Sequence, residues 1–185
     1  MYSSIGSTDH EGRRIDFGRT AADYERYRPG FPASFFSVLK DREWITVGDR
    51  AVDLGTGTGT IALGLARCGL DVTGLDIAPE LLEVATRTAD RHGSTVQFLE
   101  GRAEATGLPA SSYDLVTAGQ CWWWFDSGAV IEEVRRILRP GGRLIICDFS
   151  YLVLPDNVAG RTEALILEHN PRWPKAGWRG IHPEQ

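Results

Sequence analysis

Residues 50–62 read RAVDLGTGTGTIA, and this stretch decides the fold of the chain. The apolar residues around Asp53 predict a short buried strand. Gly55, Gly57 and Gly59 follow at alternate positions, and glycine lets the backbone turn sharply and approach a ligand without a Cβ in the way. A helix-like pattern comes next, so backbone amides at its start can face that ligand. Because an ionised carboxylate is rarely buried without a partner, we expect Asp53 to meet a cationic group of the ligand.

The rest of the chain alternates strand-like and helix-like segments. This alternation predicts an open α/β domain with a mostly parallel sheet. The predicted strands are residues 51–54, 71–77, 95–99, 113–120 and 143–149, and the predicted helices are residues 33–40, 60–68, 79–92, 127–138 and 158–168. Gly69 and Gly93 are expected to end two of these helices, and Pro140-Gly141-Gly142 a third.

Length and composition narrow the function. At 185 residues, the chain is expected to form one main domain. Its net charge of −5 indicates that it lacks the basic surface with which proteins bind nucleic acid or an anionic membrane. We expect a mobile segment over residues 1–16, the domain over 17–150 and a helix and tail over 151–185. The three cysteines, which are far apart, suit reduced thiols in the cytoplasm, and no metal site is predicted.

A second acid distinguishes between two classes of cofactor. Asp76 ends the second predicted strand, nineteen residues beyond Gly57, where a carboxylate can accept the hydroxyls of a ribose. This arrangement also fits an NAD-dependent oxidoreductase. Asp53 just before the glycines would repel a pyrophosphate, whereas it would favour the ammonium and sulfonium groups of S-adenosyl-L-methionine (SAM).

Five segments in order resemble the class I SAM-dependent methyltransferases, within them the methyltransferase type 11 group. VDLGTGTGT at 52–60 resembles motif I, VTGLDIAPELLEVA at 72–85 the motif II region and YDLVTAGQCWWWFD at 113–126 motif IV. GRAEATGLP at 101–109 resembles the loop beside the adenine, and LRPGGRLII at 138–146 the turn into strand five. The resemblance implies a three-layer, Rossmann-like methyltransferase fold with five core strands, SAM as cofactor and a small-molecule methyl acceptor.

The resemblance also implies roles for individual residues. Those expected to bind the cofactor are Asp53, Gly55, Thr56, Gly57, Gly59 and Gln120 around the methionine end, Asp76 at the ribose, Ile77, Arg102 and Ala103 around the adenine, and Tyr24 and Arg28 in a covering helix. That helix either packs on the domain, covers the cofactor or does both. Many relatives have an acid where this chain has Arg102, and many read His-Trp-Phe at residues 123–125, so no catalytic base is assigned.

Three adjacent tryptophans, Trp122, Trp123 and Trp124, follow the fourth predicted strand. Neighbouring side chains point in different directions, so all three cannot enter the core. They either cover the edge of the core or form an aromatic wall of the acceptor pocket.

Relatives of the resembled family continue beyond strand five with a helix and two antiparallel strands that help to enclose the substrate. We expect this chain either to be truncated or to cover its last strand by association, which would make it a homo-oligomer. An inactive SAM-binding module therefore stays open beside the active methyltransferase and the oxidoreductase.

Overall fold

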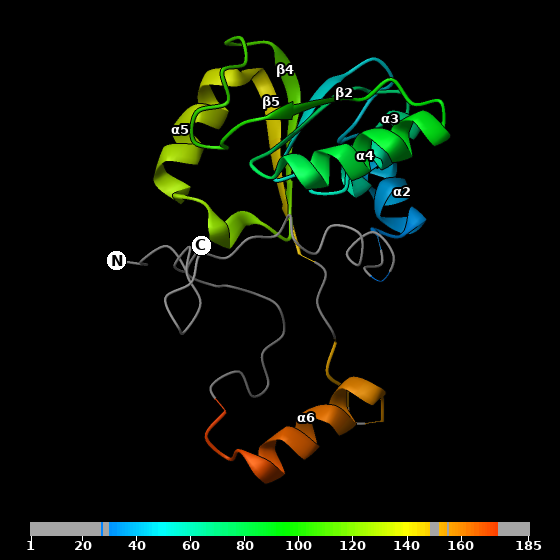
Figure 1. Cartoon of the computed structure of the whole chain (residues 1–185), viewed down its shortest axis with the longest axis vertical. Coiled ribbons are helices and arrows are strands. Elements are labelled where there is room, and N and C mark those ends of the chain that lie inside the picture. Colours follow the sequence, from blue (N-terminus) through cyan, green and yellow to red (C-terminus); the bar gives the residue numbers. More distant parts are fainter. Residues whose placement is uncertain (1–26, 28–29, 149–151, 155, 174–185) are drawn as a thin grey trace. The chain divides into compact units, whose positions relative to one another are not determined.

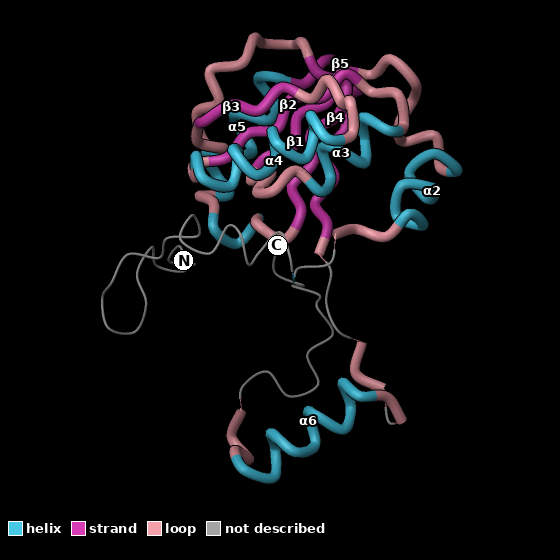
Figure 2. The backbone as a smooth tube through the Cα atoms, turned by 45° about the vertical axis from the view of Figure 1, so that its right-hand side comes forward, coloured by secondary structure: helices cyan, strands magenta, loops and turns pink. Residues whose placement is uncertain are grey.

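A five-stranded sheet forms the centre of the computed structural model, which describes residues 27, 30–148, 152–154 and 156–173. Its strands are β1 (Arg50–Leu54), β2 (Asp71–Asp76), β3 (Gln97–Glu100), β4 (Tyr113–Gly119) and β5 (Leu138–Cys147). They lie in the order β3-β2-β1-β4-β5, as Figure 2 shows, and every neighbouring pair is parallel. The predicted α/β class with a parallel sheet is confirmed.

Helices cover both faces of this sheet. Figure 1 shows α5 (Ser127–Ile137) on one side and α3 (Thr60–Arg67) and α4 (Pro79–Arg91) on the other, with α2 (Ala33–Asp41) beside α3. Successive strand residues point to opposite faces, so Val52 packs with Val130 of α5 while Ala51 packs with Ile61 of α3. The result is a three-layer domain with an apolar core on each side of the sheet.

The helix ends follow the signals in the sequence. Gly69 and Gly93 adopt positive φ values of 90° and 62° just beyond α3 and α4, and this conformation is least strained for glycine. Pro79 occupies the first turn of α4. Asp126 caps α5, because its carboxylate accepts a hydrogen bond from the amide of Ala129 at 3.1 Å.

The last strand begins earlier than predicted. We expected a helix to residue 138, a break at Pro140-Gly141-Gly142 and a strand over 143–149, but α5 ends at Ile137 and Leu138 already pairs with Tyr113. Regular pairing resumes only at Arg143, so the proline and glycines lie in a bulge inside β5. The strand ends at Cys147, and Phe149 lies outside the described residues.

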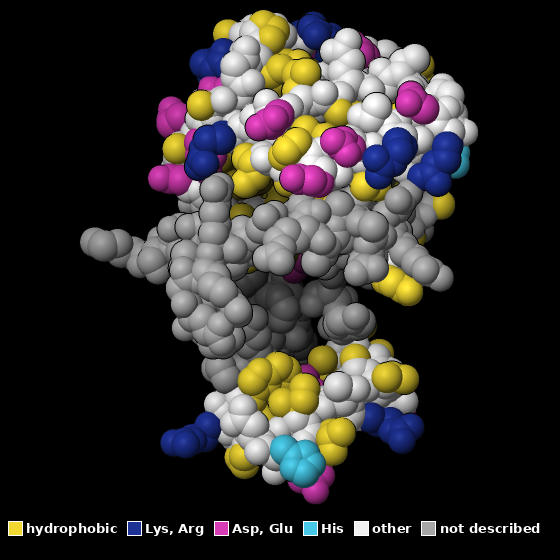
Figure 3. Space-filling model, in the orientation of Figure 1, with side chains coloured by type: hydrophobic (Ala, Val, Ile, Leu, Met, Phe, Trp, Pro, Cys, Tyr) yellow, Lys and Arg dark blue, Asp and Glu magenta, His cyan; other side chains and the backbone are white. Residues whose placement is uncertain are grey.

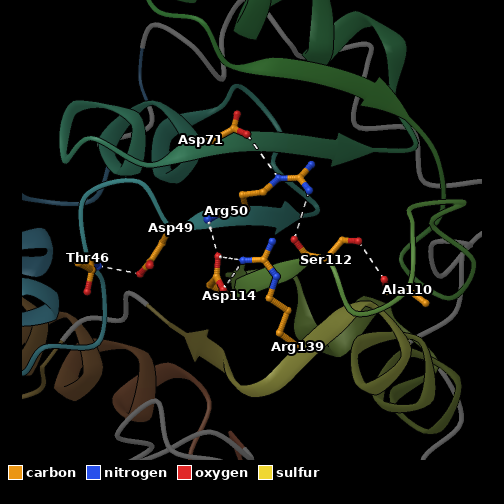
Figure 4. Close-up of polar contacts among 8 residues, drawn as sticks. All are labelled: Thr46, Asp49, Arg50, Asp71, Ala110, Ser112, Asp114 and Arg139. Carbon is orange, nitrogen blue, oxygen red and sulfur yellow. Dashed lines mark hydrogen bonds and ion pairs between the residues drawn. The ribbon is translucent and has the colours of Figure 1, made fainter.

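Ion pairs and hydrogen bonds join the amino ends of four strands (Figure 4). Asp114 of β4 accepts the amide of Arg50 of β1 at 2.9 Å and both its oxygens accept from the guanidinium of Arg139, at 2.8 and 2.9 Å. The guanidinium of Arg50 pairs with Asp71 of β2 at 3.5 Å and lies over the ring of Tyr113. This network lies at the edge of the sheet opposite the carboxyl ends of the strands.

The chain divides into two compact units, Met1–Cys147 and Asp148–Gln185. The second contains α6 (Val158–His169), which Asn157 caps through the amide of Gly160 at 2.8 Å. Among the described residues, no helix is both long enough and apolar enough to cross a membrane.

Candidate functional site

The carboxyl ends of three adjacent strands bring most of the predicted site residues together. β1 lies between β2 and β4, with Leu54 paired to Leu75 on one side and to Ala118 on the other. The glycine segment after β1, the acid that ends β2 and the residue that follows β4 therefore lie at one edge of the sheet. Open α/β sheets bind ligands at this edge.

The glycine segment forms a tight loop with one open position. Gly55, Gly57 and Gly59 have φ values of 63°, 55° and 79°, so other residues would be strained there. A Cβ on Gly55 would lie 2.8 Å from the Sγ of Cys121, whereas a Cβ on Gly57 would meet no atom within 4 Å. The first glycine thus packs on the protein, and the second has open space beside its backbone.

Asp76 holds this loop in place. One carboxylate oxygen accepts the amide of Gly57 at 2.8 Å and the other accepts the amide of Ala78 at 3.0 Å. Burial raises the pKa of Asp76, and these hydrogen bonds partly oppose the rise. A carboxylate has about four acceptor positions, so capacity remains for a ribose hydroxyl.

Asp53 lies beneath the loop, with only 2% of its surface exposed. Its two oxygens accept hydrogen bonds from the hydroxyls of Thr56 and Thr117, each at 2.7 Å. Burial raises its pKa to about 6, against the lowering effect of the two hydroxyls. Among the described residues, the side-chain partners of Asp53 are neutral hydroxyls. A cationic ligand group as a further partner of Asp53 stays a prediction.

Thr117 is a site residue that the sequence did not reveal. It lies in the middle of β4, fully buried, and pairs in register with Asp53. A threonine inside a strand is ordinary, and only the register between β1 and β4 shows that its hydroxyl meets the carboxylate. Thr56, which was expected near the cofactor, directs its hydroxyl to Asp53 and its amide to the carbonyl of Leu75 at 3.0 Å.

The residues predicted around the adenine flank Asp76. The side chain of Ile77 is 60% exposed, as an apolar surface for a flat ring requires. Ala103 is buried in the core, while the guanidinium of Arg102 pairs with Glu104 at 3.3 Å. Because β2 and β3 are neighbours, the loop that follows β3 lies beside the end of β2.

The segment after β4 turns sharply toward the tryptophans. Gln120 has a φ of 57°, and its amide donates to the carbonyl of Cys147 at 2.9 Å. The three tryptophans then form a short 3-10 helix, η2 (Trp122–Trp124). Trp122 packs in the core against Phe125, with ring centroids 6.1 Å apart, whereas Trp123 and Trp124 are half-buried. As expected, the three do not all enter the core, although Trp124 also packs against it.

Two expected site residues lie outside the described part of the chain. These are Tyr24 and Arg28 of the predicted covering helix. Among the residues that the structure describes, no three His, Cys, Asp or Glu side chains gather to hold a metal ion.

The loop suits a ribose and a cation better than a pyrophosphate. The amides of Thr56, Gly57 and Gly59 already donate to acceptors within the protein. A pyrophosphate in this loop would therefore lack those three donors and would face the carboxylates of Asp53 and Asp76. A ribose hydroxyl or an ammonium group would instead find acceptors and negative charge.

A scan against protein families and searches of known proteins agree with this geometry. The family model described as a methyltransferase domain matches residues 52–146. An uncharacterized methyltransferase of Mycobacterium tuberculosis is 39% identical over 130 residues, which cover 70% of this chain and 50% of that protein. The chain thus spans about half the length of these curated relatives.

Solved structures show the same fold. A candidate SAM-dependent methyltransferase of Methanococcus maripaludis matches with a TM-score of 0.68 at 19% identity, over 100% of this chain and 82% of that one. Phosphoethanolamine N-methyltransferase 2 of Haemonchus contortus matches with a TM-score of 0.62 at 25% identity, over 70% of this chain and 32% of that one. The latter was solved in complex with phosphomonomethylethanolamine and S-adenosylhomocysteine.

Proposed function

The chain belongs to the methyltransferase domain family, a family of class I SAM-dependent methyltransferases, and we propose that it transfers the methyl group of SAM to a small-molecule acceptor. The observation that carries the proposal is the contact between Asp76 and the amide of Gly57. It places a carboxylate with acceptor capacity beside an exposed stretch of glycine backbone. The family match favours a methyltransferase over the NAD-dependent oxidoreductase that the glycine spacing alone left open.

The residues of the site fit SAM group by group. The remaining acceptor positions of Asp76 suit the ribose hydroxyls, and the exposed side chain of Ile77 suits one face of the adenine. The open backbone at Gly57 suits the methionine portion. The charge of Asp53 under the loop favours the ammonium and sulfonium cations, because electrostatic interactions are strong where water is excluded.

SAM supplies a methyl group on a positively charged sulfur, which an acceptor atom can displace in line. The contribution of the chain is to hold the acceptor collinear with the breaking bond, and such positioning supplies several kcal/mol, up to roughly 10 kcal/mol, of the barrier reduction. In this proposal the half-buried Trp123 and Trp124 form one wall of the acceptor pocket and exclude water. No residue is assigned as a general base.

A small acceptor is favoured over a nucleic acid. The chain has a net charge of −5, and on the face drawn in Figure 3 the acidic and basic side chains of the described residues are interspersed. A nucleic-acid site needs a basic patch or stripe. The Haemonchus enzyme, a similar protein, was solved with a small amino alcohol phosphate.

A turnover assay tests the proposal. Purified protein is incubated with SAM carrying a labelled methyl group and a panel of small phenols, amines and thiols, and both labelled product and S-adenosylhomocysteine are measured. We expect label in at least one acceptor and, at a subsaturating concentration of SAM, much less label with Asp76→Ala. Binding of SAM without transfer to any acceptor would instead support an inactive SAM-binding module.

A further inference from the structure

The second half of the loop that follows β3, residues 101–109, forms hydrogen bonds to α5. One carboxylate oxygen of Glu133 accepts both the amide and the hydroxyl of Thr106. The guanidinium of Arg136 donates to the carbonyl of Leu108 at 2.7 Å and also pairs with Glu133. The guanidinium of Arg136 lowers the pKa of Glu133 to about 2, so the Glu133 carboxylate is ionised over the whole physiological pH range.

The near half of the same loop is joined to a different segment through Glu104. One oxygen of its carboxylate accepts the amide of Asp126 at 3.1 Å, and the other pairs with Arg102 at 3.3 Å. The Glu104 side chain is only 17% exposed. Asp126 both follows the aromatic residues 122–125 and caps α5.

Glu104 therefore links the two halves of the candidate site. On one side it pairs with Arg102, and Arg102 and Ala103 are the residues predicted to border the adenine. On the other side it holds the backbone where the tryptophan segment, residues 122–125, ends. We propose that Glu104 is a positioning residue through which cofactor binding at the loop orders the tryptophan segment that faces the acceptor. This inference rests on the proposed function, since it needs SAM or its product at the loop.

The hydrogen bond to the amide is the part of this link that matters. Arg102 is 69% exposed, and exposed ion pairs contribute little. The bond to the amide of Asp126 at 3.1 Å needs only an acceptor oxygen within reach, which a carboxylate or a side-chain amide can supply. The coupling should therefore depend on the reach of the side chain at residue 104 more than on its charge.

Two conservative variants separate reach from charge. Glu104→Gln keeps an oxygen at the same distance and loses the charge, whereas Glu104→Asp keeps the charge and is one methylene too short to reach the amide. Glu132→Asp is the matched control, because Glu132 is an exposed residue of α5 whose ion pair with exposed Arg135 takes no part in this link.

The measurement is iodide quenching of tryptophan fluorescence with and without saturating S-adenosylhomocysteine. Trp44, Trp173 and Trp178 are replaced by phenylalanine throughout, so that only Trp122–Trp124 emit. In this background we expect S-adenosylhomocysteine to reduce quenching by about twofold, and the same reduction in Glu104→Gln and Glu132→Asp. In Glu104→Asp the reduction should disappear, while thermal unfolding shows a folded protein and the dissociation constant rises by no more than about tenfold, equivalent to about 1.4 kcal/mol.

Each result decides something different. Persistence of the reduction in Glu104→Asp, or its loss in Glu104→Gln alone, would overturn the role given to Glu104. If the protein that keeps Glu104 binds S-adenosylhomocysteine with no change in quenching, cofactor binding does not order the tryptophan segment. The proposed function would remain. A protein that does not bind S-adenosylhomocysteine at all would contradict the proposed function itself.

Discussion

A buried carboxylate with neutral partners is the most telling residue of the site. Asp53 is almost fully buried and accepts hydrogen bonds from two threonine hydroxyls. Burial of a negative charge without a cation is costly, and proteins retain such groups chiefly where function needs them. The pKa of about 6 expresses this cost, since the rise from 3.8 corresponds to roughly 3 kcal/mol.

The stability of the cofactor-free protein should therefore depend on Asp53 in a defined pH range. A raised pKa in the folded state means that the folded protein binds the proton more tightly, so the contribution of Asp53 to stability is greatest below pH 3.8 and is lost as the pH rises through about 6. We expect Asp53→Asn to abolish this part of the pH dependence. The free energy of unfolding by urea, measured from pH 4 to pH 7, checks this.

Asp90→Asn is the control for this experiment, because Asp90 is an exposed residue of α4. It should leave the slope of stability against pH unchanged. Parallel curves for Asp53→Asn and the unmutated protein would show that Asp53 does not titrate as described.

Sequence spacing located the acids and glycines of the site but could not supply their partners. Asp53, Gly57 and Asp76 are recognisable because strand ends and a glycine turn have local signatures. Thr117 and Glu104 are not, since their roles depend on strand register and on the path of a loop. The sequence left open whether Trp122, Trp123 and Trp124 cover the edge of the core or line the acceptor pocket, and the structure packs Trp122 into the core.

At the scale of the elements, the two ends of the parallel strands have different roles. The carboxyl ends of β1, β2 and β4 carry the candidate site, and the amino ends carry the network around Asp114. Desolvation alone would raise the pKa of Asp114, but the Arg50 amide and the Arg139 guanidinium together lower it. The network thus fastens β4 to β1 and to the bulged start of β5.

Loss of this network should lower stability without altering the cofactor site. We expect Asp114→Ala to lower the free energy of unfolding by about 1–2 kcal/mol, because it leaves the Arg50 amide and the Arg139 guanidinium without this acceptor. Its affinity for S-adenosylhomocysteine should stay within about twofold, because the network and the candidate site lie at opposite edges of the sheet. Urea unfolding and calorimetric titration measure the two quantities.

Glu132→Ala is a matched control here, since it removes an exposed ion pair with Arg135 and should cost at most about 0.5 kcal/mol. A loss of affinity in Asp114→Ala as large as its loss of stability would contradict the separation of the two edges.

The helices and strands lie close to where local sequence patterns predicted them, except for the start of β5. Alternation of strand and helix patterns predicted all five strands and their parallel sheet, and glycines marked two helix ends. The start of β5 was wrong because Pro140-Gly141-Gly142 is a chain break by local rules, whereas pairing with β4 accommodates it as a bulge.

At the scale of the molecule, the family fold and the arrangement of charges both support the proposed methyl transfer from SAM. The matched family region runs from residue 52 to residue 146, within the unit Met1–Cys147. All the predicted site residues that the structure describes lie in this same unit. The fold alone does not distinguish methyl transfer from other chemistry, so the conclusion depends on what Asp53, Gly57 and Asp76 bind.

Calorimetric titration of the intact protein with SAM and NADH, side by side, tests this central claim most directly. We predict binding of SAM, no measurable binding of NADH, and at least about a tenfold loss of SAM affinity in Asp76→Ala, with affinity unchanged in the exposed control Asp90→Ala. Binding of NADH in preference to SAM, or an Asp76→Ala variant with undiminished affinity for SAM, would contradict it.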